Sequence, residues 1–254
     1  MAKKYEVVMK KLVERDPAAW LASLGIETDG PIGIVDADLS KITSEADRIV
    51  LVESSEPHLV HMEFHSARDL ELAERLLINN VNIGFELKRR VESHAILLHP
   101  SVDSSELTGL FRKATPDGDP VLAFYYRIVR AWTLPVEPLL TGDIRVTPLA
   151  PLANVAENTV SEIIRRVDSR LSSETEPSTA HMIMETTLVL AGLRLGEKTI
   201  RHFRETLKSM TTLKDPSYSR PVDGKGLEKG REEGLKKGRE EDLKKGKSRK
   251  IGGF

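Results

Sequence analysis

The hydrophobic pattern changes period twice within the first hundred residues, and this constrains the fold more than any other feature of the sequence. Apolar and polar residues alternate over 32–39, 46–52 and 59–65, which is the period of a β-strand. A segment with helical spacing follows over about 69–90, with Leu72, Leu76, Leu77 and Val81 as its apolar stripe, and a near-continuous apolar run covers 93–98. Such a run is typical of a strand that is buried on both faces, as in a parallel pair. The order β-β-β-α-β therefore predicts an α/β protein.

Helical segments flank this predicted core. Residues 3–15 and a second short segment that begins at Pro17 predict a helical N-terminus,. A further strand is predicted over 121–130. Residues 152–210 have helical spacing throughout and are expected to form three helices,.

These patterns divide the chain into three predicted parts. Residues 1–150 form the α/β domain, 151–215 an α-helical region and 216–254 a low-complexity tail. The tail repeats units such as Gly-Leu-Glu-Lys-Gly-Arg-Glu-Glu, with one leucine in each. Because one leucine in eight residues cannot build a core, we expect this charged tail to be disordered or to become helical on association.

Composition excludes several classes of function. The chain has no cysteine, which excludes disulfides, thiolate metal sites and a cysteine nucleophile. Apolar runs are far shorter than the ~20 residues of a membrane span, and the first residues do not resemble a signal peptide. We therefore expect a cytoplasmic protein without a membrane partner, and nothing in the sequence indicates a small-molecule cofactor.

Charge is unevenly distributed along the chain. Residues 221–254 carry a net charge of +4 and the preceding residues −5, which together make −1. A protein that binds nucleic acid by bulk positive charge would have a basic body. Any contact of this chain with nucleic acid is therefore expected to be local.

One strand places three polar side chains on a single face. His61, Glu63 and His65 alternate with apolar residues, so they point the same way. Asp47 opens the preceding strand, and hairpin pairing would bring it beside Glu63 or His65. An Asp and a Glu at one sheet edge form the hard-oxygen site that Mg²⁺ or Mn²⁺ prefers, and such a site suits metal-assisted hydrolysis of phosphodiesters.

Two other interpretations stay open from these residues alone. In the first, the polar side chains are the exposed face of a half-buried hairpin. In the second, His61, Glu63 and His65 bind Zn²⁺ or Mn²⁺ in an unrelated hydrolase, because imidazole favours such metals over Mg²⁺.

Six short segments are informative through their order and spacing along the chain, although no single segment is specific. They are Asp16–Leu21, Ser44–Val52, Pro57–Ser66, Arg75–Asn80, Tyr125–Trp132 and Thr147–Leu152. Together they resemble the recombination-promoting nuclease family, whose members also carry a transposase label and which is a branch of the PD-(D/E)XK nuclease superfamily. The resemblance covers residues 5–155.

The resemblance implies an αβββαβ core with a mixed sheet and a Mg²⁺-dependent DNA endonuclease, with Mn²⁺ as an alternative metal. It places the two metal ligands at Asp47 and Glu63. His65 falls where the family has Gln or Lys and is expected to be catalytic; a neutral imidazole can orient water or act as a base near pH 7 but supplies no fixed charge. Asn79 stands where relatives carry Tyr.

Arg75, in the predicted long helix, has two interpretations. It could contact a phosphate of the DNA, or it could pair with Asp69 and Glu71 on its own helix.

The departures at His65 and Asn79 keep an alternative function open. In it, the chain retains the fold without catalysis and acts as a nucleic-acid-binding or assembly module. Under either function a homodimer is a plausible state, since a single site cuts only one strand of a duplex.

Overall fold

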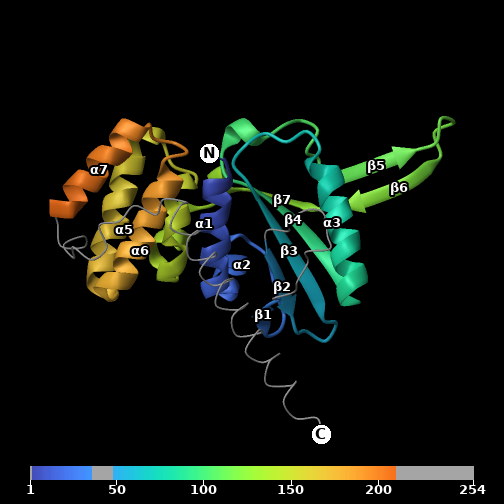
Figure 1. Ribbon diagram of the computed structural model, residues 1–254, viewed down its shortest axis with the longest axis horizontal. Coiled ribbons are helices and arrows are strands. Elements are labelled where there is room, and N and C mark those ends of the chain that lie inside the picture. The colour runs from blue at the N-terminus through green and yellow to red at the C-terminus, as the bar shows by residue number, and fades with distance from the viewer. Residues whose placement is uncertain (1, 36–47, 210–254) are drawn as a thin grey trace, which may run out of the picture. The chain divides into compact units, whose positions relative to one another are not determined.

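A five-stranded mixed sheet organises the residues that the computed structural model describes, 2–35 and 48–209 (Figure 1). Its order is β1-β2-β3-β4-β7; β1, β2 and β3 are antiparallel neighbours, whereas β4 runs parallel to both β3 and β7. The strands are β1 Ile32–Ile34, β2 Arg48–Val52, β3 His58–His65, β4 Arg90–Leu97 and β7 Arg127–Arg130. This confirms the mixed α/β class and the parallel pairing predicted for the strand after the long helix.

Helices cover both faces of the sheet. α1 (Ala2–Arg15) and α2 (Pro17–Ser23) lie on one side, and α3 (Leu72–Leu87) lies on the other (Figure 1). The Asp16 carboxylate accepts a hydrogen bond from the Ala19 N–H at 3.0 Å, so it caps α2 as the Asp-Pro signal predicts. The predicted N-terminal helices are therefore confirmed.

The long helix is shorter and rotated relative to the prediction. It begins at Leu72 and not at Asp69, whose carboxylate accepts the Glu71 N–H at 2.9 Å outside the helix. Val81, which was expected in the buried stripe, is 57% exposed, whereas Ile83 is fully buried. The packed face of α3 is therefore a narrower stripe than the apolar residues alone indicate.

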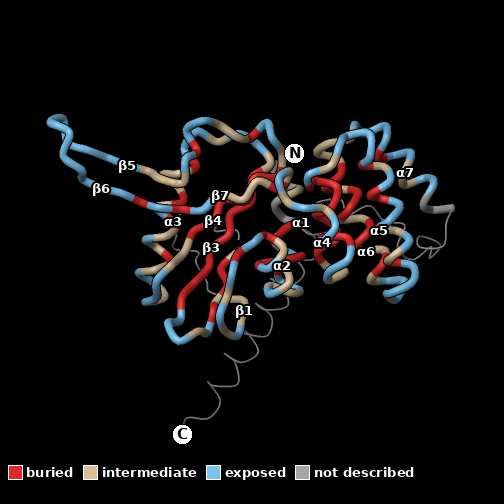
Figure 2. Tube along the Cα trace, turned by 180° about the vertical axis from the view of Figure 1, so that it is seen from behind, coloured by how far each residue is buried: buried red, intermediate tan, exposed pale blue. Residues whose placement is uncertain are grey.

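The strand predicted over 121–130 is two strands in two sheets. β6 (Pro120–Tyr125) pairs with β5 (Leu110–Ala114), which the sequence pattern did not reveal, and β7 joins the main sheet. The break falls at Tyr126, whose N–H donates to the Gly109 carbonyl at 3.0 Å. The β5–β6 hairpin projects from the sheet (Figure 1) and is largely exposed (Figure 2).

The three helices predicted after residue 152 are present. They are α5 (Val160–Glu174), α6 (Pro177–Ala191) and α7 (Glu197–Ser209), and a short α4 (Val136–Thr141) precedes them. α6 contacts α1, so the helical region packs against the N-terminal helix. The described residues all fall within one compact unit, Met1–Thr212.

The predicted boundary at residue 150 stays a prediction, and the predicted tail, 216–254, lies outside the described residues.

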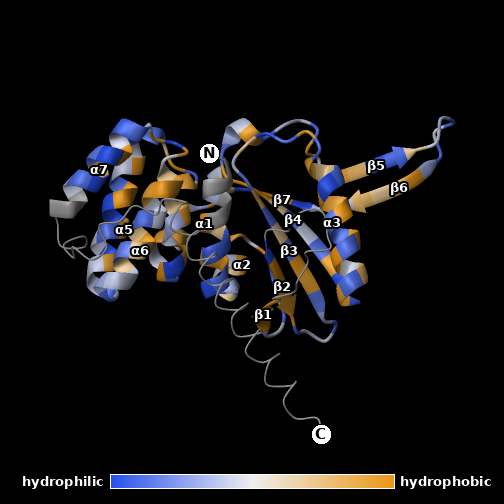
Figure 3. Ribbon diagram, in the orientation of Figure 1, coloured by the Kyte–Doolittle hydropathy of each residue, from blue (hydrophilic) through white to orange (hydrophobic). Residues whose placement is uncertain are grey.

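Hydrophobic residues concentrate on the strands of the main sheet, whereas α7 is largely hydrophilic (Figure 3). Among the described residues, no helix combines the length and the apolar character that crossing a membrane requires. Beneath α3, one buried core cluster joins the helix to β4 and to the base of the hairpin. Its residues are Leu72, Leu76, Ala95, Leu97, Val102, Leu107, Phe124 and Tyr126.

Candidate functional site

β3 is buried along its whole length, on both faces. Its odd-numbered residues point towards α3, because Leu59 packs with Ile83 of that helix and side chains of α3 reach Glu63. Glu63 itself is only 4% exposed. The interpretation of this face as the exposed side of a half-buried hairpin is therefore wrong, because α3 covers it.

Two side chains of α3 hold the buried carboxylate of Glu63. Arg75 donates to Oε1 through Nε at 2.8 Å and approaches the same oxygen through Nη2 at 2.7 Å. Asn79 donates to Oε2 from Nδ2 at 3.3 Å. A buried carboxylate is strongly unfavourable unless it is paired and hydrogen-bonded, and these charge-assisted contacts meet that requirement.

Arg75 joins Glu63 to a second carboxylate at the start of the helix. Its Nη1 donates to Oδ2 of Asp69. Burial alone would lower the pKa of Arg75, but Glu63 and Asp69 outweigh it and raise that pKa. Burial likewise opposes ionisation of Asp69, yet the Glu71 N–H and Arg75 lower its pKa. Both groups are therefore held in their charged forms.

The two histidines beside Glu63 are neutral at neutral pH. Burial lowers the pKa of His65 to about 4, with a further contribution from Arg75 that Asp69 partly opposes. Burial also lowers the pKa of His61 to about 3, with smaller contributions from His94 and His65. His65 Nε2 lies 3.6 Å from Glu63 Oε1, and His61 Nε2 lies 4.0 Å from Oε2. These distances exceed hydrogen-bond length.

A second set of contacts continues this polar layer towards β4. His61 Nδ1 lies 3.3 Å from the Ser93 hydroxyl on the paired strand. Asn80 of α3 donates to the same hydroxyl at 3.0 Å and to the Val91 carbonyl at 2.9 Å. Polar side chains therefore connect β3, β4 and α3 beneath the helix.

The described residues do not by themselves form a metal site. Within 2–35 and 48–209, no group of three or more His, Asp or Glu side chains is arranged to hold a metal ion. Alternation does place His61, Glu63 and His65 of the zinc interpretation on one face, but as arranged here they do not form such a group. Asp47, the other predicted metal ligand, lies outside the described residues.

Sequence reasoning placed the residues of β3 correctly but missed their partners. Arg75 contacts both Glu63 and Asp69, whereas the sequence predicts a pairing with Asp69 and Glu71 and does not predict the contact with Glu63. The role of Asn79 was missed. One signal could have found it: Asn79 lies four residues after Arg75, on the same helix face, among otherwise apolar inward positions.

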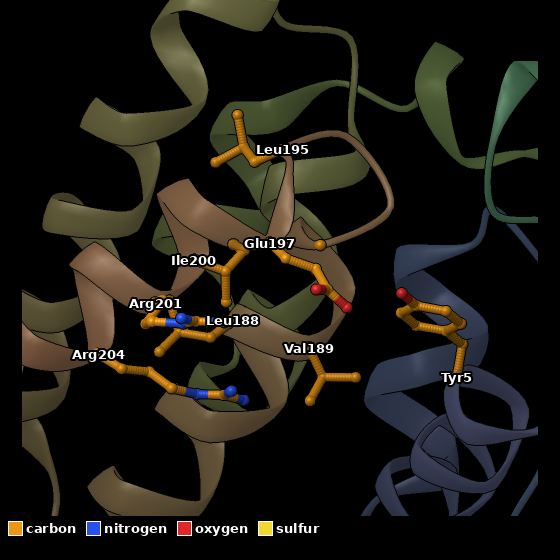
Figure 4. Close-up of a pocket in the computed structure, with 9 residues that line it drawn as sticks. Tyr5, Leu188, Val189, Leu195, Glu197, Ile200, Arg201 and Arg204 are labelled. Atoms are coloured by element: carbon orange, nitrogen blue, oxygen red, sulfur yellow. The ribbon is translucent and has the colours of Figure 1, made fainter. Parts of the chain in front are cut away.

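A separate cavity of about 300 Å³ lies among residues of α1, α6 and α7 (Figure 4). Tyr5 faces Glu197 across it (Figure 4), and burial, with the nearby charge of Glu197, raises the pKa of the tyrosine hydroxyl. Arg204 at its edge forms an ion pair with Glu185 at 3.1 Å. None of the predicted site residues lines this cavity.

Fold and site together define a mixed α/β protein with a buried, charged polar layer between its central strand and one helix. Comparisons of the chain with family models, with curated proteins and with solved structures found no match.

Proposed function

We propose that this chain is a metal-dependent DNA endonuclease of the PD-(D/E)XK type, related to the recombination-promoting nucleases that its sequence resembles. The element order supports this proposal. Helices α1 and α2, the antiparallel strands β1 to β3, the crossover helix α3 and the parallel strand β4 follow one another as in an αβββαβ core.

The buried carboxylate of Glu63 is the observation that carries the proposal. It lies near the carboxyl end of β3, the central strand, which pairs in parallel with β4. The carboxyl ends of strands are where α/β sheets bind ligands. A charged acid in the core lowers the stability of the fold. A catalytic role would explain why this position nevertheless holds a glutamate.

We assign the metal, Mg²⁺ with Mn²⁺ as an alternative, to Glu63 together with Asp47. Arg48, the next residue after Asp47, pairs with Met62, the residue before Glu63. If this register continued by one position, it would bring the two acids together. A bound divalent ion would activate water and stabilise negative charge on the phosphate.

His65 and Arg75 have supporting roles in this proposal. His65 is neutral, so it can orient water; with a pKa of about 4 it is a weak base at neutral pH, and it does not supply the positive charge that a lysine would,. Arg75 already pairs with Glu63 and Asp69. Because Glu63 and Asp69 already occupy three of the five N–H donors of its guanidinium,, we propose that Arg75 positions Glu63.

One observation favours the alternative function, a catalytically inactive protein that binds nucleic acid or supports assembly. Both carboxylate oxygens of Glu63 already have protein partners, Arg75 on Oε1 and Asn79 on Oε2. Such pairing can stabilise a buried acid without any metal.

A plasmid-nicking assay on the full chain tests the two functions. We expect nicking of supercoiled DNA with Mg²⁺ or Mn²⁺ and none with EDTA. Glu63→Gln, which keeps the side-chain shape, and Asp47→Ala should each lower the rate by more than about 100-fold. Glu86→Gln changes an exposed carboxylate on the same helix as Arg75 and should leave the rate unchanged.

The outcome also separates the proposal from its alternative. If folded wild-type protein is inert with every metal but binds labelled DNA, the alternative is supported. If nicking survives Glu63→Gln, the proposed site is wrong.

A further inference from the structure

The outward face of α3 exposes large apolar side chains that are normally buried. Ile78 is 46% exposed, Val81 57% and Phe85 75%. They lie opposite the inward positions Leu72 and Ile83, which are buried. α3 is therefore apolar on two sides, although only one side packs against the sheet.

The exposed residues form a stripe with a charge of opposite sign at each end. Ile78, Val81 and Phe85 follow helical spacing along one face. Glu74 precedes the stripe by one turn, and Lys88 follows it, with its Nζ 4.8 Å from the centroid of the Phe85 ring. We call these five positions the α3 stripe.

The α3 stripe is nearly symmetrical about its centre. Val81 lies seven residues after Glu74 and seven before Lys88, which places the two charges about 10 Å on either side of it along the helix. A two-fold axis through Val81 would therefore exchange the acidic end with the basic end, as a self-complementary interface requires.

We propose that a second copy of this chain covers the α3 stripe, with the two α3 helices antiparallel. In this arrangement Glu74 faces Lys88 of the partner subunit, and Ile78 packs near Phe85 of the partner subunit. A parallel arrangement would bring like charges together. Antiparallel helices also place opposite ends of the helix dipoles side by side.

The size of the α3 stripe sets the strength of the dimer. One helix face of this length, about 21 Å, covers less than the roughly 800 Å² per partner of a standard interface. We therefore expect a weak dimer whose population depends on concentration. The inference does not depend on nuclease activity, since it concerns the face of α3 that points away from Glu63.

Analytical ultracentrifugation of the full chain, over an about hundredfold concentration range around micromolar, tests the interface. Phe85→Glu should raise the dimer dissociation constant by at least about 30-fold. Tyr125→Glu is a matched control: Tyr125 is 70% exposed, but it lies on the β5–β6 hairpin, so the dissociation constant should stay unchanged. Circular dichroism establishes that both variants are folded.

Charge reversal tests the antiparallel arrangement. Glu74→Lys and Lys88→Glu should each weaken the dimer about 10-fold, because every dimer contains the altered contact twice. The double variant should restore wild-type affinity. Since Glu74 also pairs with Lys113 within one copy at 2.6 Å, Lys113→Glu controls for loss of that internal pair and should not weaken the dimer.

Three results would overturn the proposal. The first is a wild-type chain that stays monomeric throughout the concentration range. The second is a dimer that Phe85→Glu leaves intact, which would place the interface elsewhere, as in the C-terminal repeat. The third is a dimer that is insensitive to the single charge reversals, which would exclude the antiparallel pairing.

Discussion

The two faces of β3 are equally buried but chemically opposite. Val60, Met62 and Phe64 point away from α3, on the side where α1 contacts the strand. His61, Glu63 and His65 alternate with them and lie beneath α3. The apolar face is stabilised by packing alone, whereas the polar face is stable only when its charges find partners. A chain that needed only stability would have filled both faces with apolar residues.

A histidine on the neighbouring strand departs from this division. His94 of β4 pairs with Met62 in the register, so it points to the apolar side. It is fully buried, and neither ring nitrogen has a hydrogen-bond partner among the described residues. Burial, with a smaller contribution from Arg127, lowers the pKa of His94 to about 4. This histidine is therefore neutral at neutral pH.

The largest effect on stability is expected on the apolar face. Phe64→Ala should lower the free energy of unfolding by about 3–5 kcal/mol, because it leaves a cavity in a fully packed core. Urea denaturation measures this loss. Val121→Ala, at an exposed position of the hairpin, should cost less than about 1 kcal/mol. A similar loss for both variants would show that the apolar face does not dominate stability.

On the polar face, removing one partner should cost more than removing both. Glu63→Leu should lower the free energy of unfolding by about 2 kcal/mol, since it leaves the partly buried charge of Arg75 without its main partner. Glu63→Leu combined with Arg75→Met should recover most of this loss in a double-mutant cycle. Additive losses would mean that the two side chains are not coupled, and would contradict the contact.

The departure at His94 predicts a dependence on pH. Its folded pKa, about 4, lies below the ordinary 6.5, so between these values the unfolded chain binds more protons and stability falls as pH drops. His94→Leu should reduce that slope by up to about 1.4 kcal/mol per pH unit. Urea denaturation at several pH values between 4 and 7 measures it, and an unchanged slope would show that His94 is not protonated on unfolding in this window.

The smallest effect is expected where the polar layer ends. Asn80→Ala should lower the free energy of unfolding by about 1 kcal/mol, because the side-chain amide donates hydrogen bonds to the Val91 carbonyl and the Ser93 hydroxyl,. Asn82→Ala, two residues along the same helix, should cost less than about 0.5 kcal/mol. Equal losses, measured by thermal unfolding, would show that the two hydrogen bonds of Asn80 do not add to stability.

Strand alternation made part of this site predictable. Because successive side chains of a strand point to opposite faces, the sequence alone placed His61, Glu63 and His65 together. Their burial could not be predicted, since it depends on whether another element covers that face. The strand β5 was missed for a related reason. Leu110–Ala114 is short and partly exposed, so it has no clear hydrophobic pattern and is a strand chiefly because it pairs with β6.

By itself, the sequence determined the α/β class, the order of the elements as far as β4, and the face of β3 that carries the polar residues, because each follows from local periodicity. Only the tertiary structure decided that α3 covers this face, that Arg75 and Asn79 hold Glu63, and that Val81 lies on the exposed side of α3. These outcomes depend on the rotation of one helix against the sheet. That rotation is set by packing between residues that are far apart in the chain, and no local pattern records it.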